Sequence, residues 1–335
     1  MTVIANEVKQ SKMFGYLRFA LAFLVLLSHI GVRFYGLNLG VVAVVIFYML
    51  AGYVVSHLYK DIFAKAPYAI LALYKDRLQR IFPLYIYVIS ITTLFLLATS
   101  YASPSFTFAS SVANLTIIPL NYFMYIDSTI LTNPSWCLIP PAWSLGAELQ
   151  AYLILPFALI SKRVKLTLAL LSFAVFSAAN FSLINPDYFG YRLIVGVFFI
   201  FLLGTAIQSN KQQDKYYIIA IFTTISVLAL YFAYTNSFSQ AYTKETFIGI
   251  LLGIPLVYSL SHTKKTLPYN KLLGALSYGI FLTHFLAIWL LDYLGISTQL
   301  SPLYILQVTA ISIIISYLGL RFVEKTALTR KYTIK

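Results

Sequence analysis

Arg18 and His29 stand eleven residues apart in the first apolar stretch of the chain. At about 100° per residue this spacing puts both side chains on one helix face, about 16 Å apart along the axis. An imidazole can take a proton from an attacking hydroxyl or act as a nucleophile, and a guanidinium binds phosphate oxygens. The structural alternative is that Arg18 extends to the end of the helix and His29 bonds a neighbouring helix.

A second polar stripe follows Trp143, where Ser144, Glu148 and Tyr152 recur every four residues. At this spacing the three side chains lie on one helix face. A carboxylate on an apolar helix needs a partner, and orientation of a histidine by a carboxylate is a recurrent catalytic arrangement. Glu148 is therefore a catalytic candidate. Trp143 taken alone is more often an anchor at a membrane interface.

Another histidine, His284, lies in the middle of an apolar stretch and shares a helix face with Ser277. His57 and His262 fall where apolar stretches end, which favours an interfacial role for them. The four histidines show neither His-x-x-x-His nor His-x-x-Glu spacing, so we predict no metal site. The single cysteine, Cys137, excludes an intramolecular disulfide.

Two arginines, Arg77 and Arg80, stand one helical turn apart shortly before Pro83. A guanidinium pair suits phosphate groups, because each fork donates two parallel hydrogen bonds. The alternative is a cluster of basic residues that only sets the orientation of the protein in the membrane.

The composition requires that these residues be held by membrane helices. Hydrophobic residues make up 60% of the 335-residue chain and charged residues only 10%, whereas about 25% of the residues in a soluble domain are charged. Apolar runs recur that are long enough to cross a hydrocarbon core of about 30 Å. We predict an all-α polytopic membrane protein, because helices satisfy their own backbone hydrogen bonds. About ten transmembrane helices are expected, at residues 14–34, 38–58, 81–101, 143–160, 166–182, 191–209, 216–234, 245–261, 273–294 and 302–322.

The net charge of +14 is distributed in short clusters between the apolar runs, which indicates membrane topology and not a nucleic-acid surface. Basic residues fill the even-numbered connections, and only Arg33, Arg192 and Lys244 fall on the other side. Both termini are therefore expected in the cytoplasm. We predict an amphipathic interfacial helix at residues 60–80 and an outer loop at about 102–142, which could be a lid or bind an acceptor.

Aromatic side chains on the outer side offer flat faces and hydroxyl groups to a ligand, although aromatic residues also gather at membrane interfaces. They are Tyr35, Tyr122, Tyr125, Trp136 and Tyr191. We predict one transmembrane domain over residues 1–335, without an appended soluble domain.

Several short motifs, taken in order, make the chain resemble acyltransferase family three, the bacterial membrane-bound acyltransferases. They are Leu17–Ala22 with His29, Phe47–Tyr53, Arg77 and Arg80 with Pro83, Trp143–Leu145 with Glu148, and Ser277–Tyr278 with His284. The resemblance covers nearly the whole chain. Ala51 departs from the family pattern, which usually has a serine before the glycine, and we expect no role for that position.

The resemblance implies an O-acyltransferase of the bacterial inner (plasma) membrane. Such proteins move an acyl group, usually acetyl, from cytoplasmic acyl-coenzyme A to a hydroxyl of a polysaccharide or lipid-linked glycan, with membrane lipids as surroundings and no metal. His29 is expected to be the base or to carry the acyl group itself, and Glu148 to orient or charge-balance its ring. The remaining expected roles are coenzyme A binding by Arg18, Arg77 and Arg80, and substrate binding by Trp143, Ser144, Tyr152 and His284.

Two other classes of protein fit parts of the same pattern. Buried His, Arg and Glu side chains on ten helices also describe a proton-coupled transporter of a small polar solute. Against this, the sequence shows no broken helices at corresponding places in two halves. A membrane scaffold is the third class, and it predicts no effect of alanine at His29 or Glu148.

Overall fold

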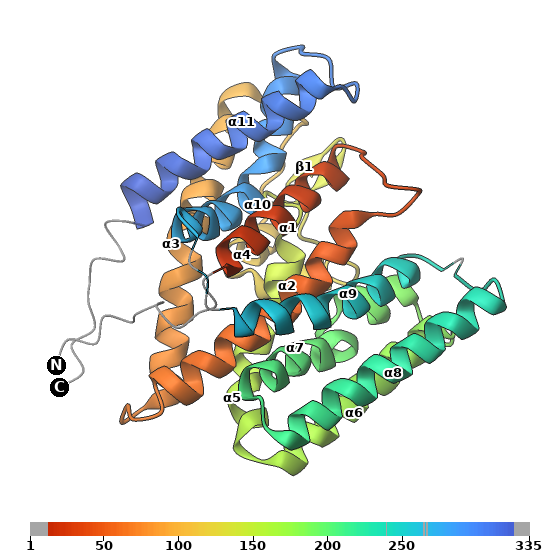
Figure 1. Ribbon diagram of the computed structural model, residues 1–335. Helices are drawn as coiled ribbons and strands as arrows, with labels where there is room; N and C mark the ends of the chain where they lie inside the picture. The colour runs from red at the N-terminus through yellow and green to blue at the C-terminus, as the bar shows by residue number, and fades with distance from the viewer. Residues whose placement is uncertain (1–12, 239, 264, 266, 325–335) are drawn as a thin grey trace.

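The computed structural model describes residues 13–238, 240–263, 265 and 267–324 and shows a bundle of helices (Figure 1). Its long helices are α1 (Phe14–His29), α2 (Leu39–His57), α3 (Ala69–Thr99), α5 (Ala142–Ile160), α6 (Lys162–Asn180), α7 (Ile194–Ser209), α8 (Gln212–Tyr234), α9 (Thr243–His262), α10 (Asn270–Tyr293) and α11 (Pro302–Gly319). Within the described residues, nine helical segments are long and apolar enough to cross a membrane, and α1 is a shorter apolar helix. The prediction of an all-α polytopic membrane protein with about ten helices is confirmed.

Helix α3 differs from its predicted bounds. The segment expected as a separate interfacial helix is the first part of α3, which begins at Ala69 and continues through Pro83. Buried side chains on both sides of the proline, Leu73 and Leu84, hold it against the rest of the protein. Packing of this kind lets a membrane helix keep a proline. The first part of α3 therefore carries Arg77 and Arg80 to the lining of a cavity described below.

The segment expected as an outer loop is folded over the ends of the helices. It contains the short helix α4 (Phe108–Thr116), a turn of 3₁₀ helix at Ile118–Tyr122, and a hairpin of strands β1 (Leu131–Thr132) and β2 (Ser135–Trp136). In the antiparallel hairpin, Leu131 pairs with Trp136. This pairing fixes the indole at one edge of a cavity described below.

Helices α2 and α7 form the centre of the bundle, where nearly all of their side chains are buried. They approach so closely that a Cβ atom on Gly52 would lie 1.9 Å from the carbonyl oxygen of Phe201. A Cβ atom on Gly204 would lie 1.9 Å from the carbonyl oxygen of Met49. Small residues at such contacts let membrane helices pack backbone to backbone.

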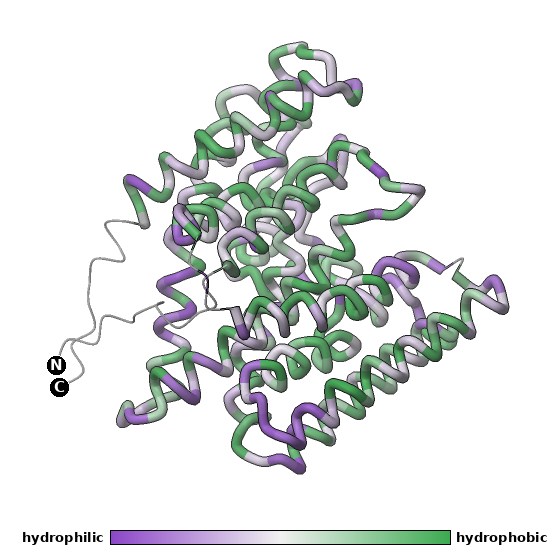
Figure 2. Tube along the Cα trace, viewed as in Figure 1, coloured by the Kyte–Doolittle hydropathy of each residue, from purple (hydrophilic) through white to green (hydrophobic). Residues whose placement is uncertain are grey.

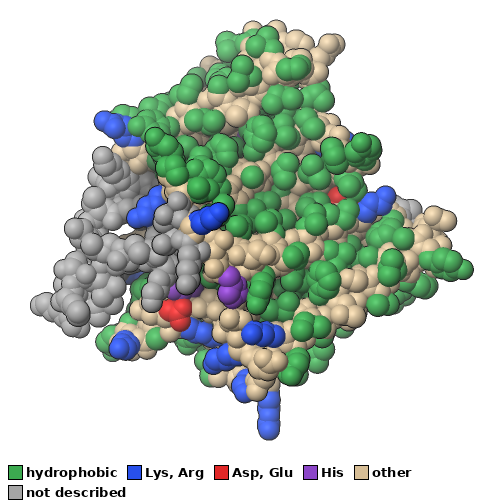
Figure 3. All heavy atoms as spheres, viewed as in Figure 1, with side chains coloured by type: hydrophobic (Ala, Val, Ile, Leu, Met, Phe, Trp, Pro, Cys, Tyr) green, Lys and Arg blue, Asp and Glu red, His purple; other side chains and the backbone are tan. Residues whose placement is uncertain are grey.

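Hydrophobic residues predominate along the outer helices in Figure 2, and apolar side chains cover much of the face seen in Figure 3, as expected for helices in lipid. Leu170, Leu230 and Leu306, for example, are more than half exposed on α6, α8 and α11. Lys and Arg lie mostly along the left and lower edges of the face seen in Figure 3, and the lower group lies where α6 and α8 begin in Figure 1. The lipid-facing surface and the basic edges are therefore separate.

Candidate functional site

Helices α1 and α10 run parallel and in register, and this register brings two histidines together. Near their starts, the backbone N–H of Gly15 donates to Oδ1 of Asn270 at 2.9 Å. Fourteen residues further along each helix, Nδ1 of His29 lies 3.0 Å from Nε2 of His284. The two rings are stacked, with centroids 5.0 Å apart. The pair therefore depends on packing between helices at opposite ends of the sequence.

The hydrogen bonds assign one tautomer to each ring. Nδ1 of His284 lies 2.9 Å from the carbonyl oxygen of Ile280, and a carbonyl can only accept. His284 is completely buried, so a neutral ring is favoured, with its proton on Nδ1. Its Nε2 then accepts from Nδ1 of His29. The unprotonated nitrogen of His29 is consequently Nε2, on a ring that is exposed.

His29 opens into a cavity of about 490 Å³, the histidine cavity. Its lining side chains come from α1, the β hairpin, the start of α5 and the segment before α7, and include Arg33, Trp136, Cys137, Trp143 and Arg192. Burial raises the pKa of the Cys137 thiol to about 12. Because the thiolate is the reactive form, this cysteine is a poor nucleophile at neutral pH.

Arg192 is held at the wall of the histidine cavity by aromatic rings and a carboxylate. Its guanidinium carbon lies 4.5 Å from the ring centroid of Trp143 and 5.3 Å from that of Tyr191. Nε donates to Oδ1 of Asp187 at 2.7 Å. The π-helical turn Tyr188–Arg192, just before α7, brings the carboxylate and the guanidinium to the same side.

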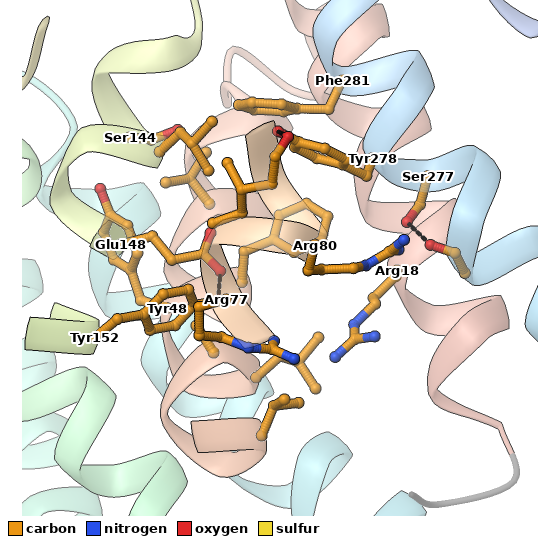
Figure 4. A pocket seen from close by; sticks show the side chains of 18 residues that line it. Arg18, Tyr48, Arg77, Arg80, Ser144, Glu148, Tyr152, Ser277, Tyr278 and Phe281 are labelled. Atoms are coloured by element: carbon orange, nitrogen blue, oxygen red, sulfur yellow. Dashed lines mark hydrogen bonds between the residues drawn. The ribbon is translucent and has the colours of Figure 1, made fainter. Parts of the chain in front are cut away.

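A second cavity, of about 130 Å³, is lined by three arginines, and we call it the arginine cavity. Arg18 comes from α1, Arg77 and Arg80 come from α3, and Figure 4 shows their side chains around one space. Glu148 and Tyr152 of α5 line the same cavity. With three guanidinium groups and one carboxylate, its lining is suited to an anionic ligand.

The carboxylate of Glu148 organises one side of the arginine cavity. It accepts a hydrogen bond from the hydroxyl of Tyr152 (Figure 4), and the charges of Arg18, Arg77 and Arg80 are close enough to act on it. The guanidinium of Arg77 lies 5.8 Å from the ring centroid of Tyr152. On its other side, Nε of Arg77 donates to Oδ2 of Asp76 at 2.9 Å.

The two cavities meet at Val44, Ser144 and Phe281, which line both of them. We call these three residues the constriction. Each is less than 10% exposed, and these side chains lie between the two cavities. Helix α1 runs past both cavities, with Arg18 in one and His29 in the other. The face of α1 that was predicted to carry both residues therefore extends from the arginine cavity to the histidine cavity.

The candidate residues are divided between the cavities. The arginine cavity brings together Arg18, Arg77, Arg80, Glu148 and Tyr152, and the histidine cavity contains His29 and Trp143, with Ser144 at the constriction. The expected contact between Glu148 and His29 is not formed. Glu148 lies one helical turn beyond Ser144, on the arginine side. His284 lines neither cavity.

Arg33 and Arg192 were missed as site residues. The available signal was their position, since they are two of the few basic residues outside the clusters that the positive-inside rule explains. Sequence patterns alone give no distance between the loop after α1 and the turn before α7. No group of three or more metal-ligating side chains is found among the residues that the structure describes.

Comparison with known proteins gives a family match and one relative. Residues 14–321 match the family profile of acyltransferase family three, described as an acyltransferase domain. An uncharacterised protein of Aquifex aeolicus (strain VF5) is 39% identical over 220 residues, which make up 63% of this chain and 99% of that protein. No solved structure gives a significant match.

Proposed function

The chain belongs to acyltransferase family three, and from this membership we propose that it is an O-acyltransferase with one substrate in each cavity. Acyl-coenzyme A, with acetyl as the acyl group, binds in the arginine cavity from the cytoplasm. The acceptor is a hydroxyl of a glycan, part of a surface polysaccharide or linked to a lipid, in the histidine cavity. The protein lies in the inner membrane of a bacterium, with both termini in the cytoplasm.

The observation that carries this proposal is the contact between a cationic cavity and a cavity with an accessible imidazole. The phosphates of coenzyme A need several guanidinium donors, and Arg18, Arg77 and Arg80 provide them in one space. The thioester must reach the other cavity, and the constriction is the place where the two spaces touch. Basic residues at or next to the starts of α3, α6 and α8 support a cytoplasmic entrance to the arginine cavity.

His29 is the residue that we propose to act on the acceptor. Its unprotonated Nε2 takes the hydroxyl proton while the acceptor oxygen attacks the thioester carbonyl, and the coenzyme A sulfur leaves. The same nitrogen could instead carry the acyl group between two steps. Either route needs the lone pair on Nε2 of His29. This lone pair is available because the ring proton is on Nδ1 of His29, which donates a hydrogen bond to Nε2 of His284. We therefore propose that His284 positions His29 and does not touch substrate.

Glu148 acts on the donor side in this proposal. Its carboxylate, held by Tyr152, separates three like charges that would otherwise repel one another. Loss of Glu148 would disorder the arginine cavity and weaken the binding of acyl-coenzyme A. Trp143 and Ser144 contact the acceptor and the acyl group, respectively.

The test uses purified protein in lipid nanodiscs with acetyl-coenzyme A and a glycan acceptor. We expect release of free coenzyme A that depends on the acceptor and is abolished in His29→Ala, while the thermal unfolding midpoint stays close to that of the wild type. A well-folded His29→Ala protein that keeps most of the activity would contradict the mechanism. Movement of a solute into vesicles without thiol release would favour the transporter.

A further inference from the structure

We infer that the acceptor glycan carries a negatively charged group, a carboxylate or a phosphate, which Arg33 and Arg192 bind in the histidine cavity. This inference rests on the proposed function, since it names the class of acceptor for the same site. It arises from two arginine side chains that the binding of acyl-coenzyme A, on the other side of the constriction, does not use.

Arg192 presents donors that have no hydrogen-bond partner among the described residues. Its Nε is bonded to Asp187, but Nη1 and Nη2 make no hydrogen bond with the described residues. The side chain is only 15% exposed and lines the cavity. Packing over Trp143 at 4.5 Å fixes the plane of the guanidinium. A fixed fork of this kind matches two oxygens of a carboxylate or phosphate.

Arg33 supplies a second guanidinium on the same cavity. Its Nη1 donates to the carbonyl oxygens of Ser28 at 2.8 Å and Val32 at 3.1 Å. In the described part of the chain no carboxylate pairs with it, so its charge is not compensated by an ion pair. The charges of Arg33 and Arg192 are both close enough to act on the ring of His29. An anion bound between them would therefore lie near the reacting hydroxyl.

The carboxylates nearby do not block this site. Among the described residues, neither an Asp nor a Glu lines the histidine cavity. Asp187 is engaged by Nε of Arg192, and Glu245 accepts a hydrogen bond from the backbone N–H of Asn38 at 3.0 Å. Asp187 thus offsets the charge of Arg192, whereas no described carboxylate pairs with Arg33. Recognition of the anion thus depends on the unpartnered guanidinium donors and not on a strong positive field.

The aromatic side chains of the cavity suit the sugar that would carry the anion. The Trp136 ring packs on Phe285 with centroids 5.4 Å apart, yet Trp136 remains 40% exposed. Trp143 presents a further indole beside Arg192. Flat apolar faces next to guanidinium forks fit a sugar ring with a charged substituent. With a neutral sugar bound, the guanidinium groups would donate their free hydrogen bonds to water.

The test compares three acceptors that share their ring hydroxyls: methyl glucoside, methyl glucuronide and methyl glucoside 6-phosphate. The readout is kcat/KM for acceptor-dependent coenzyme A release in nanodiscs. Wild-type protein should prefer at least one charged glycoside over methyl glucoside by about tenfold or more, because charge-assisted hydrogen bonds are the strong ones. Preference for the glucuronide or for the phosphate distinguishes the two sources of charge.

Variants show whether the preference comes from this site. Arg33→Gln and Arg192→Gln should each reduce the ratio of charged to neutral acceptor use by about tenfold. Lys244→Gln is the matched control, because Lys244 is exposed, lies near Phe238 and does not line the cavity. Thermal unfolding midpoints confirm that the variants are folded. Equal use of neutral and charged glycosides, or a preference that survives both arginine variants, would overturn the inference.

If none of the three glycosides is used as an acceptor, the inference is tested on acylated glycans isolated from cells, by the position of the ester. An ester on a sugar that has no carboxylate or phosphate, on itself or on its neighbour, would overturn the inference and leave the proposed function intact. An ester next to such a group supports it. If no acylated glycan differs between cells with wild-type protein and cells with His29→Ala, both the proposed function and the inference fail.

Discussion

Replacement of His284 tests the proposed chain of hydrogen bonds behind His29. Nε2 of His284 accepts from Nδ1 of His29 at 3.0 Å, and His284→Leu removes this acceptor in a fully buried place. A buried donor without a partner costs about 1–3 kcal/mol. If His29 avoids this cost by moving its proton to Nε2, the reactive lone pair is lost. The corresponding reduction in kcat is about 5- to 150-fold.

Amides of two lengths make matched variants for this experiment. In His284→Gln the amide oxygen reaches about as far as Nε2 of the imidazole and can still accept from His29. In His284→Asn the shorter amide can still donate to the Ile280 carbonyl, but it does not reach His29. We expect kcat in the order wild type, Gln, then Asn and Leu. The KM for acyl-coenzyme A should stay unchanged, because His284 lines neither cavity.

The assay is release of coenzyme A in nanodiscs at saturating acceptor, with thermal unfolding as the control for folding. If His284 had only a structural role, His284→Gln and His284→Asn would lose activity to the same extent. The loss of activity would then follow the loss of stability. Full activity in a folded His284→Leu protein, or activity of Asn equal to that of Gln, would refute the reasoning.

Three other predictions concern the donor site, the packing and the thiol. Arg77→Ala and Glu148→Ala should each raise the KM for acyl-coenzyme A by about tenfold or more, because charge-assisted contacts are lost. Lys75→Ala, whose side chain lies outside the arginine cavity, serves as the control, and an unchanged KM in the first two variants would contradict the assignment. Gly52→Val should lower the thermal unfolding midpoint, since its Cβ atom would lie 1.9 Å from the Phe201 carbonyl oxygen and overpacking costs about 1–3 kcal/mol or more. Cys137→Ala should keep activity within about twofold, and N-ethylmaleimide should inhibit the wild type weakly, because the raised pKa of Cys137 leaves little thiolate at neutral pH.

The sequence predicts the helices well because the signal for each membrane helix is local. The ten expected helices are present, and the helical spacing of Arg18 and His29 agrees with their places along α1. The pairing of His29 with His284 is different in kind. It joins residues 255 positions apart and depends on the register of α1 against α10, which no local pattern records. The sequence offered Glu148 as a partner for His29, but the structure places the two side chains in different cavities.

The bounds of α3 and the placement of Arg33 and Arg192 also depend on contacts that the sequence does not show. Composition marked residues 60–80 as amphipathic, but whether such a segment ends before Pro83 or continues depends on what packs against Leu73 and Leu84. Arg192 reaches the histidine cavity because the turn before α7 orients it against Trp143. Tertiary contacts of this kind appear only when the helices are assembled.

The constriction has a consequence for the electrical balance of the reaction. In the orientation that we propose, the hydroxyl proton is released to His29 on the outer side, whereas the thiolate that needs a proton forms on the cytoplasmic side. Only the acyl group passes Val44, Ser144 and Phe281, so when each proton stays on its own side, one proton is consumed in the cytoplasm and one appears outside, which moves one positive charge outward in each turnover. A complete crossing of the membrane is worth about 2.3 kcal/mol per 100 mV. An inside-negative membrane potential would thus oppose acylation by this route, whereas return of the proton from His29 past the constriction to the thiolate would make the transfer electroneutral.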